Sequence, residues 1–416
     1  MAILFAIYYS TDSHVDLDKE YVTSSWPIFI FRMTASKILI SAGKVFLPKP
    51  LRVFDDFFGY FKSQVMYVTL DLGIPDILHD GPKNSSEIAV LTGVVNPDDI
   101  TRWLRAAESF GYYEYDIKSS KWRNTELSNL LRASHPTSMA YSLRHSKMQL
   151  FDAYDSAISA LKTGQNAFEI SHDGRSFFQY LKENPENNSV FNAAMALITR
   201  LSLPLREDYN WGKECNRIID IGGGNGQFLT DIISLHSNLK GIVFDLDHVV
   251  EAGESNLKKN HPHLLSKIAF RAGSMFEPDT YPKFEDGDCI SLKHVLQPWS
   301  DEIAITILQN IKRNMEGTES KLLVVERVLE EHNDNPSNYV NDLTLMLMTP
   351  GGKHRTKSEF LPILSNQDLA FSRLYVFALL ILLLWPCLQS RFLKGIDFAK
   401  TYTRSSNDGF IQRRGC

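Results

Sequence analysis

One stretch, residues 217–233, constrains the fold of this chain more than any other. It reads RIIDIGGGNGQFLTDII, so an apolar segment runs into a cluster of glycines and an amphipathic segment follows. This pattern is typical of a buried parallel strand that ends in a tight turn, with a helix beginning directly after the turn. Glycines let the backbone of such a turn pass close to a ligand. The stretch predicts a nucleotide-type cofactor site, although a plain strand-turn-helix corner leaves a similar pattern.

The next apolar segment, residues 241–246, makes the cofactor interpretation more specific. It reads GIVFDL and places Asp245 at its end, about 20 residues beyond the glycines, where a carboxylate can bind ribose hydroxyls. The turn lacks a compact GxGxxG motif, and the acidic Asp220 precedes its first glycine. A carboxylate there would repel a pyrophosphate but suits a cationic ligand. S-adenosylmethionine (SAM), with its sulfonium and amino groups, therefore fits better than NAD.

Four sequence blocks together resemble class I SAM-dependent O-methyltransferases of the caffeate and fungal polyketide type. The blocks are IIDIGGGNG (218–226), VFDLDHVV (243–250), AGSMF (272–276) with SLKHVLQPWSDE (291–302), and PGGKHRTKSEFLPIL (350–364). The resemblance implies an α/β fold: a Rossmann-like SAM-binding methyltransferase domain with a mostly parallel sheet. A mainly helical, winged-helix-like dimerisation domain would precede it.

The resemblance also implies which residues contact SAM. Gly222 and Gly224 belong to the cofactor turn, with Gly222 against the methionine part, and Asp245 holds the ribose. The adenine lies between Ser274 and Met275, and Lys293 lies near its edge. The family usually has an aspartate at the position of Ser274, and a serine hydroxyl accepts the adenine hydrogen bond more weakly than a carboxylate.

The catalytic positions of the family are altered in this chain. The family pattern has His-Asp-Trp, in which the histidine removes the proton from the acceptor hydroxyl, whereas this chain has Gln297 before Pro298-Trp299. A glutamine amide cannot act as a base. A carboxylate that steadies the histidine follows Gly-Gly-Lys in the family, and here that position is His354. Of the three catalytic residues, only Glu326 matches.

Two functional classes follow from these changes, with a catalytically silent partner protein as a third reading. The first is a SAM-dependent pericyclase of fungal-type secondary metabolism, which keeps the cofactor but catalyses a cycloaddition or dehydration of a polyketide-amino acid hybrid. Such a step needs a held conformer and charge stabilisation rather than a base. Gln297, His354 and His145 would then bind a substrate carbonyl or enol. The alternative is an O-methyltransferase acting on a polyketide or phenolic hydroxyl, with His354 as a relocated base. We favour the pericyclase at this stage.

The region before the glycine turn is expected to be helical. Residues 57–78, 85–92 and 97–107 have apolar residues at helical spacing, and residues 112–124 alternate as in a small hairpin. By the resemblance this region makes a homodimer. Phe191 and Met195 match pocket-lining positions for a small natural-product substrate, although an apolar pair at this spacing is equally typical of plain core.

Composition excludes several other classes. With a net charge of −5, the chain has no excess of positive charge of the kind that binds nucleic acid. The four cysteines lack metal-like spacing, so reduced thiols in a cytoplasmic protein are expected, and no motif suggests a metal site. The cysteines are Cys215, Cys289, Cys387 and Cys416.

The expected organisation has four parts: an N-terminal extension (1–45), the dimerisation and substrate-lid domain (46–205), the SAM-binding domain (206–375) and an atypical tail (376–416). The apolar run 376–388 is too short to span a bilayer as a helix. Three readings remain open: an interfacial anchor, which would be the only expected membrane contact, a buried segment, or the product of a mispredicted splice junction. We favour the mispredicted junction because the family resemblance stops just before this run.

Overall fold

The computed structural model describes residues 46–200, 209–332 and 336–365, together with Ala35, Gly43, residues 400–403 and residues 412–415. Within it the chain forms two compact units, Met1–Met148 and Gln149–Cys416. The predicted segment 376–388 and most of the N-terminal extension lie outside the described residues. Among the residues that are described, no helix is long and apolar enough to cross a membrane.

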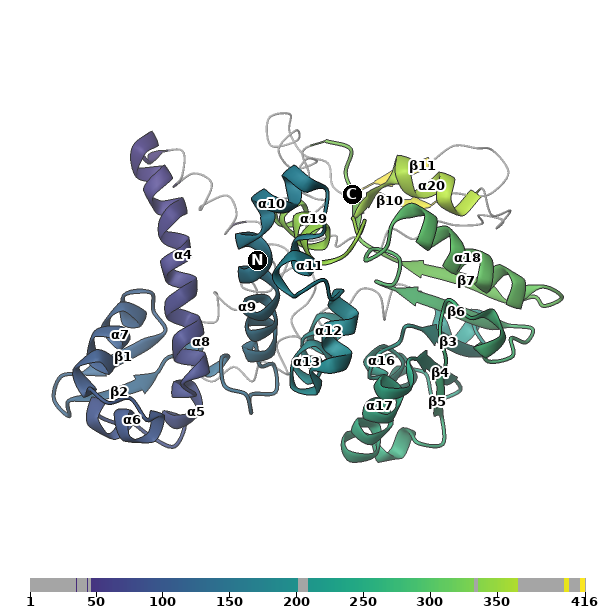
Figure 1. The fold of residues 1–416 in the computed structure, drawn as a ribbon. Coiled ribbons are helices and arrows are strands. Elements are labelled where there is room, and N and C mark those ends of the chain that lie inside the picture. The colour runs from purple at the N-terminus through teal and green to yellow at the C-terminus, as the bar shows by residue number, and fades with distance from the viewer. Residues whose placement is uncertain are drawn as a thin grey trace. The chain divides into compact units, whose positions relative to one another are not determined.

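The first unit is mainly helical, as predicted. A long helix, α4 (Lys49–Asp71), leads into α5 (Ile74–Ile77), α6 (Ser85–Thr92) and α7 (Pro97–Ser109) (Figure 1). The strands β1 (Tyr113–Asp116) and β2 (Lys121–Asn124) pair antiparallel, so the predicted hairpin is confirmed. The short α8 (Glu126–Asn129) follows, and α9 (Ala140–Asp155) begins in this unit and ends in the second.

Local sequence explains where α6 begins and ends. The Asn84 side chain accepts a hydrogen bond from the backbone N–H of Glu87, and the Glu87 carboxylate accepts one from the N–H of Asn84. This capping box satisfies two N–H groups that the first helical turn leaves unpaired. Gly93 ends the helix in the left-handed conformation, which glycine adopts at little cost.

The second unit is built on a five-stranded sheet in the order β5-β4-β3-β6-β7. Its strands are β3 (Arg217–Ile221), β4 (Lys240–Asp245), β5 (Ile268–Ala272), β6 (Asp288–Lys293) and β7 (Lys321–Val325), and every neighbouring pair is parallel. The predicted parallel sheet is confirmed. Because the chain moves outward in both directions from β3, the crevice at the carboxyl ends of β3 and β6 is the place where such sheets bind ligands.

Helices cover both faces of this sheet (Figure 1). One face packs against α16 (Gln227–Leu235) and α17 (Asp247–Asn260) through buried residues such as Leu229 and Leu257. The other packs against α18 (Asp301–Met315) and α20 (Lys357–Ser365), with Ile219 and Ile307 in its core. The strands are therefore apolar on both sides, as the sequence of residues 217–221 predicts.

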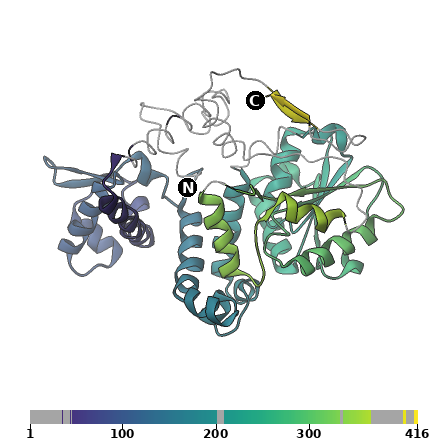
Figure 2. The ribbon, with the colours of Figure 1, turned by 90° about the horizontal axis from the view of Figure 1, so that it is seen from above.

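A group of helices completes the second unit. It comprises α10 (Ala157–Thr163), α11 (Ala167–Ser171), α12 (Phe177–Glu183), α13 (Pro185–Arg200) and α19 (Pro336–Met348). Seen from above, α19, in light green, lies beside the teal helices (Figure 2), and its contact is with α11. Smaller elements are α15 (Trp211–Glu214), the parallel pair β8 (Val328–Leu329) and β9 (Arg355–Thr356), and the antiparallel pair β10 (Lys400–Thr403) and β11 (Gln412–Gly415).

The expectation of four reduced thiols is wrong for one pair of cysteines. Cys215 and Cys289 form a disulfide, with their Cα atoms 5.5 Å apart. Cys215 lies just before β3, separated from it by Asn216, and Cys289 lies on β6, the neighbouring strand, where it is opposite Ile218. Spacing could not reveal this pair because the two residues are 74 positions apart and only the sheet brings them together.

Candidate active site

The glycine turn after β3 is held against the end of β4. The N–H of Gly222 donates to the carbonyl of Phe244, and the N–H of Gly224 donates to Oδ2 of Asp245 at 2.8 Å. The other carboxylate oxygen of Asp245 accepts the N–H of Leu246. The carboxylate predicted to hold the ribose is thus fixed by backbone donors at the carboxyl edge of the sheet.

Two carboxylates, the buried Asp220 and the partly buried Asp245, lie at this edge of the sheet. Burial raises the pKa of Asp220 to about 7, partly offset by the hydroxyl of Ser291, which donates to it at 2.7 Å, and by the charge of Lys293. Burial also raises the pKa of Asp245, although the N–H groups of Gly224 and Leu246 favour its ionised form. A cationic ligand near Asp220 would restore its ionised form, and donors such as ribose hydroxyls suit Asp245. The residues present therefore fit SAM.

The backbone of the turn requires glycine at Gly222 for two reasons. Its φ is +67°, and an added Cβ would lie 2.9 Å from Cγ2 of Val295, a stiff β-branched side chain. Gly224 has φ +59°, but an added Cβ would meet nothing within 4 Å. We expect Gly222→Ala to lower the free energy of unfolding by about 2–4 kcal/mol and Gly224→Ala by only about 1 kcal/mol. Urea unfolding measures both, and equal losses would mean that Val295 yields without cost.

The adenine side of the predicted cofactor site is also well anchored. The backbone carbonyl of Met275 accepts hydrogen bonds from the Tyr281 hydroxyl and from Nδ2 of Asn310. The Ser274 hydroxyl oxygen accepts the N–H of Phe276 at 3.2 Å. One acceptor site of that oxygen is therefore used within the loop, and one remains for a ligand.

Lys293 lies at the end of β6 and faces α13. Its ammonium group donates to Oγ1 of Thr199 at 2.9 Å, and its charge acts on Asp220. Thr199 shares one helical face with Phe191 and Met195, since the three are spaced four residues apart. This contact turns the predicted substrate-lining face of α13 toward the carboxyl ends of β3 and β6. The position of Lys293 near the adenine edge stays a prediction.

Backbone contacts bring Gln297, Glu326 and His354 to one place. Oε1 of Glu326 accepts the N–H of Leu296 at 2.7 Å, and the carbonyl of Gln297 accepts the N–H of Lys353 at 2.9 Å. The pairing of β8 with β9 holds the segment after Glu326 beside the segment after His354. Three segments far apart in sequence thus form one loop cluster next to the cofactor edge.

Several polar atoms of this cluster are buried and find no hydrogen-bond partner among the described residues. They are Oε1 of Gln297 and Nδ1 of His354, while Oε2 of Glu326 and Nδ1 of His294, which also lack a hydrogen bond, face each other at 3.7 Å. Buried polar atoms are normally paired, so unpaired ones gathered in one place are expected where a ligand binds.

His294 is a residue that the sequence analysis missed. Its φ is +57°, a conformation that is costly for a non-glycine residue and is often found at functional sites. Its Nδ1 lies 3.7 Å from Oε2 of Glu326. Burial and the charge of Lys293 lower its pKa. In the sequence, the only sign of a functional role for His294 is its place between Lys293 and Gln297 in the motif.

The environment of His354 makes it a poor base. Burial lowers its pKa to about 3, and the charges of Arg327, His294 and Arg355 add to this effect. Its backbone N–H donates to Asp342 at 2.7 Å, so this carboxylate holds the main chain rather than the ring. The ring is neutral near pH 7, and its weak basicity argues against the relocated base considered above.

This pKa also predicts a pH dependence of stability. Since the pKa of His354 is about 3 in the folded chain and 6.5 for a solvated histidine, the unfolded chain binds more protons between these values. The stability contributed by neutral His354 is full above about pH 6.5 and is lost as the pH falls toward about pH 3. Between about pH 7 and about pH 5 we expect the unchanged protein to lose up to about 2 kcal/mol of its free energy of unfolding through His354. The His354→Gln variant should not show this loss. Urea unfolding at about pH 7 and about pH 5 tests this, and identical pH dependence in both proteins would contradict it.

Aromatic side chains line up beside the loop cluster. Phe191 packs edge-on against Phe177, and Phe178 stacks on Trp299 with ring centroids 5.5 Å apart. Trp299 in turn packs edge-on against Phe276. Because Phe177 and Phe178 are also in contact, the ring of Phe191 is linked through aromatic contacts to the loop that carries Gln297; its place in a substrate pocket stays a prediction.

His145 lies on the part of α9 that belongs to the first unit. Burial lowers its pKa to about 3, and its catalytic role stays a prediction.

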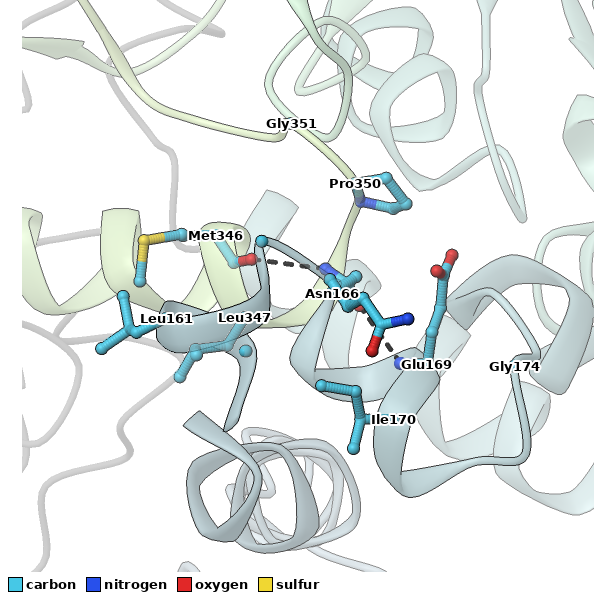
Figure 3. Close-up of a pocket in the computed structure, with 12 residues that line it drawn as sticks. Leu161, Asn166, Glu169, Ile170, Gly174, Met346, Leu347, Pro350 and Gly351 are labelled. Carbon is cyan, nitrogen blue, oxygen red and sulfur yellow. Dashed lines mark hydrogen bonds between the residues drawn. The ribbon is translucent and has the colours of Figure 1, made fainter. Parts of the chain in front are cut away.

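A pocket of about 840 Å³ lies between α10, α11, α19 and residues 350–351 (Figure 3). Asn166 ties its walls together by donating to the carbonyl of Met346. None of the predicted site residues lines this pocket.

Comparison with known proteins decides the family. The family profile of the O-methyltransferase domain matches residues 154–370, and that of the O-methyltransferase dimerisation domain matches residues 54–134. This chain belongs to the O-methyltransferase family. SAM is the cofactor of this O-methyltransferase-family protein, as predicted from the glycine turn and Asp245.

Individual relatives agree with this membership. A phenazine O-methyltransferase of Lysobacter antibioticus is 32% identical over 76% of this chain and 89% of its own length. The mitomycin biosynthesis 6-O-methyltransferase of Streptomyces lavendulae is 26% identical over 76% and 87%. The crystal structure of LaPhzM superposes with a TM-score of 0.70 at 29% identity, covering 77% of this chain and 93% of that one. These relatives are methyltransferases rather than pericyclases by name, so the resemblance to the pericyclase branch is not supported.

Proposed function

We propose that this protein is a SAM-dependent O-methyltransferase that methylates a hydroxyl group of a small natural product. The observation that carries the proposal is the match to the O-methyltransferase domain over residues 154–370. The relatives methylate phenazine and mitomycin intermediates, as their names state. These matches favour methyl transfer over the pericyclase activity.

The residues of the cofactor edge have distinct roles in this proposal. SAM supplies an electrophilic methyl group when bound. The Asp245 carboxylate, fixed by Gly224 and Leu246, would hold the ribose hydroxyls, and Asp220 would attract the cationic end. Ser274 and Met275 would border the adenine. Gly222 would lie against the methionine part, with no room for a side chain beside Val295.

The acceptor would lie between α13 and the loop cluster. Phe191 and Met195 share the face of α13 that Lys293 reaches through Thr199. Trp299 and its aromatic neighbours offer flat apolar surface on the other side. Gln297 and His354 would orient the acceptor by hydrogen bonds and would hold it near the methyl group, which lowers the barrier by proximity alone.

The same loop cluster favours the pericyclase as a second candidate. Neither Gln297 nor the weakly basic His354 can remove a proton efficiently, and a pericyclic step needs no such base. Both side chains can donate a hydrogen bond to a substrate carbonyl. The two candidates differ in whether the methyl group leaves the cofactor.

A homodimer is the assembly we propose. The match to the dimerisation domain covers residues 54–134, which includes most of α4. This helix exposes a group of large apolar side chains, among them Phe54, Phe57, Phe58 and Phe61. Exposed apolar patches of this kind are typical of protein contacts. Sedimentation velocity of the full chain would give twice the monomer mass for a dimer.

The proposed function is tested by following a labelled methyl group. The full-length protein is incubated with SAM carrying a trideuterated methyl group and a panel of hydroxylated naphthalenes, naphthoquinones and phenazines. We expect mass spectrometry to find the label on an acceptor oxygen together with S-adenosylhomocysteine. A product of isomeric or dehydrated mass with intact SAM would favour the pericyclase instead.

The cofactor role of Asp245 has its own test. We expect Asp245→Asn to weaken SAM binding by about 10- to 150-fold, because a charged hydrogen-bond acceptor contributes about 1.5–3 kcal/mol. Asp247→Asn is the matched control, since Asp247 is exposed two residues further along. Isothermal titration calorimetry with SAM measures both variants. Equal affinities would show that Asp245 does not hold the cofactor.

A further inference from the structure

Among the described residues of the loop cluster, an amide takes the position of the family base, and burial lowers the pKa of both nearby imidazoles, His354 and His294. Gln297 stands where the family has its base, and its buried Oε1 is unpaired among the described residues. His354 is 6% exposed, and its Nδ1 also has no hydrogen-bond partner among the described residues. These two side chains can donate or accept hydrogen bonds, but the amide cannot take up a proton at all. The two side chains can therefore hydrogen-bond an acceptor group, but neither is suited to deprotonate it.

The carboxylates around the cluster are engaged with its main chain or with basic side chains. Oε1 of Glu326 accepts the N–H of Leu296, and its Oε2 faces His294 at 3.7 Å. Asp342, from α19, accepts the N–H of His354. Asp301, at the start of α18, pairs with Arg355 at 2.8 Å and with Lys353 at 3.1 Å. Each carboxylate therefore has a partner that keeps it in place.

The cations near the cluster favour a negative charge on the bound ligand. The charge of Arg327 lowers the pKa of both His294 and His354, so its positive field reaches both rings. Lys293 acts on His294 in the same direction, whereas the Glu326 carboxylate acts in the opposite direction. Where burial reduces solvent screening, the positive charges of Arg327 and Lys293 favour an anionic ligand.

We propose that the acceptors of this enzyme carry a hydroxyl acidic enough to be ionised before methyl transfer, such as hydroxyquinones, enolised 1,3-dicarbonyls or nitrophenols. This inference rests on the proposed methyltransferase function. The anionic acceptor oxygen forms the new O–C bond with a lone pair. The S–C bond to the methyl group breaks, its electron pair stays on sulfur, and S-adenosylhomocysteine leaves. No proton moves in this step, so the lack of a base at Gln297 does not slow methyl transfer to acceptors that are already ionised.

Two probes of similar size separate acidic from ordinary hydroxyl groups. 2-Hydroxy-1,4-naphthoquinone is an anion near pH 7, whereas 2-naphthol is protonated there. We expect kcat/KM for methylation to be at least about 100-fold higher for the quinone, because general-base assistance contributes about 10²- to 10⁴-fold and is missing here. Methylation of 2-naphthol within about tenfold of the quinone would overturn the inference while leaving the proposed function intact.

A binding measurement tests the same inference without turnover. The anion of the quinone is coloured, so its visible spectrum in the presence of S-adenosylhomocysteine reports its ionisation when bound. Between about pH 5 and about pH 9 we expect the bound probe to keep a pKa no higher than in water. A raised pKa would overturn the inference. Calorimetric binding of SAM without methyl transfer to any member of the acceptor panel would instead overturn the proposed function.

Discussion

Gln297→His is expected to speed the methylation of 2-naphthol by about 100- to 10,000-fold. Histidine is the side chain that titrates near neutrality, and at this position it would lie beside Leu296, whose N–H is held by Glu326. The carboxylate of Glu326 favours the protonated imidazole, so it offsets part of the effect of burial on the pKa of the new histidine. Methylation of the anionic quinone should change little, because that acceptor needs no base.

Gln297→Asn is the matched control for this prediction. It keeps an amide but shortens the side chain, so any gain from extra space alone would appear in this variant as well. The measurement is kcat/KM for both probes across about pH 6 to about pH 9, where only Gln297→His should add an ionisation of the enzyme. Equal gains in the two variants would show that space, and not basicity, limits the reaction.

Arg355→Met is expected to lower the free energy of unfolding by about 3–5 kcal/mol and to abolish methyl transfer. The Arg355 side chain is 1% exposed and donates to Asp301 at 2.8 Å. It also donates to the carbonyls of Leu296 and Trp299, which flank Gln297. Methionine has a similar length but donates no hydrogen bond, so the loop that carries Gln297 would lose its anchor.

Lys353→Met is the control for the loss of Arg355. Lys353 pairs with Asp301 and Glu359 but is partly exposed, so its removal should cost no more than about 1 kcal/mol. Urea unfolding and kcat/KM for the quinone measure both variants. If Arg355→Met unfolds like Lys353→Met and keeps its activity, the loop is held by other contacts.

The sequence predicts the cofactor side of the site well because that side is local. The glycines of residues 222–226 and the strand end at Asp245 follow directly from short motifs, and the hydrogen bond from Gly224 to Asp245 connects them as expected. The helix at residues 85–92 and the hairpin at residues 112–124 were equally accessible, because capping and alternation are properties of neighbouring residues.

The acceptor side depends on long-range contacts and was harder to predict. The sequence offers His354 as a relocated base, but its pKa of about 3 results from burial and from the charges of Arg327, His294 and Arg355. The anchoring role of Arg355 and the strained backbone of His294 also arise only when these segments meet. The disulfide of Cys215 and Cys289 escaped prediction for the same reason. The altered residues Gln297 and His354 favour a pericyclase from sequence, whereas similarity to methyltransferases favours the alternative.

A single-turnover experiment tests the proposed activity most directly. The protein is mixed, in excess, with methyl-labelled SAM and 2-hydroxy-1,4-naphthoquinone, and cofactor and acceptor are both measured by mass spectrometry. We predict that the label passes to the acceptor oxygen, with one S-adenosylhomocysteine formed for each methylated product. Label that remains on bound SAM throughout, across the whole acceptor panel, would contradict methyl transfer and leave the cofactor as a fixed charge.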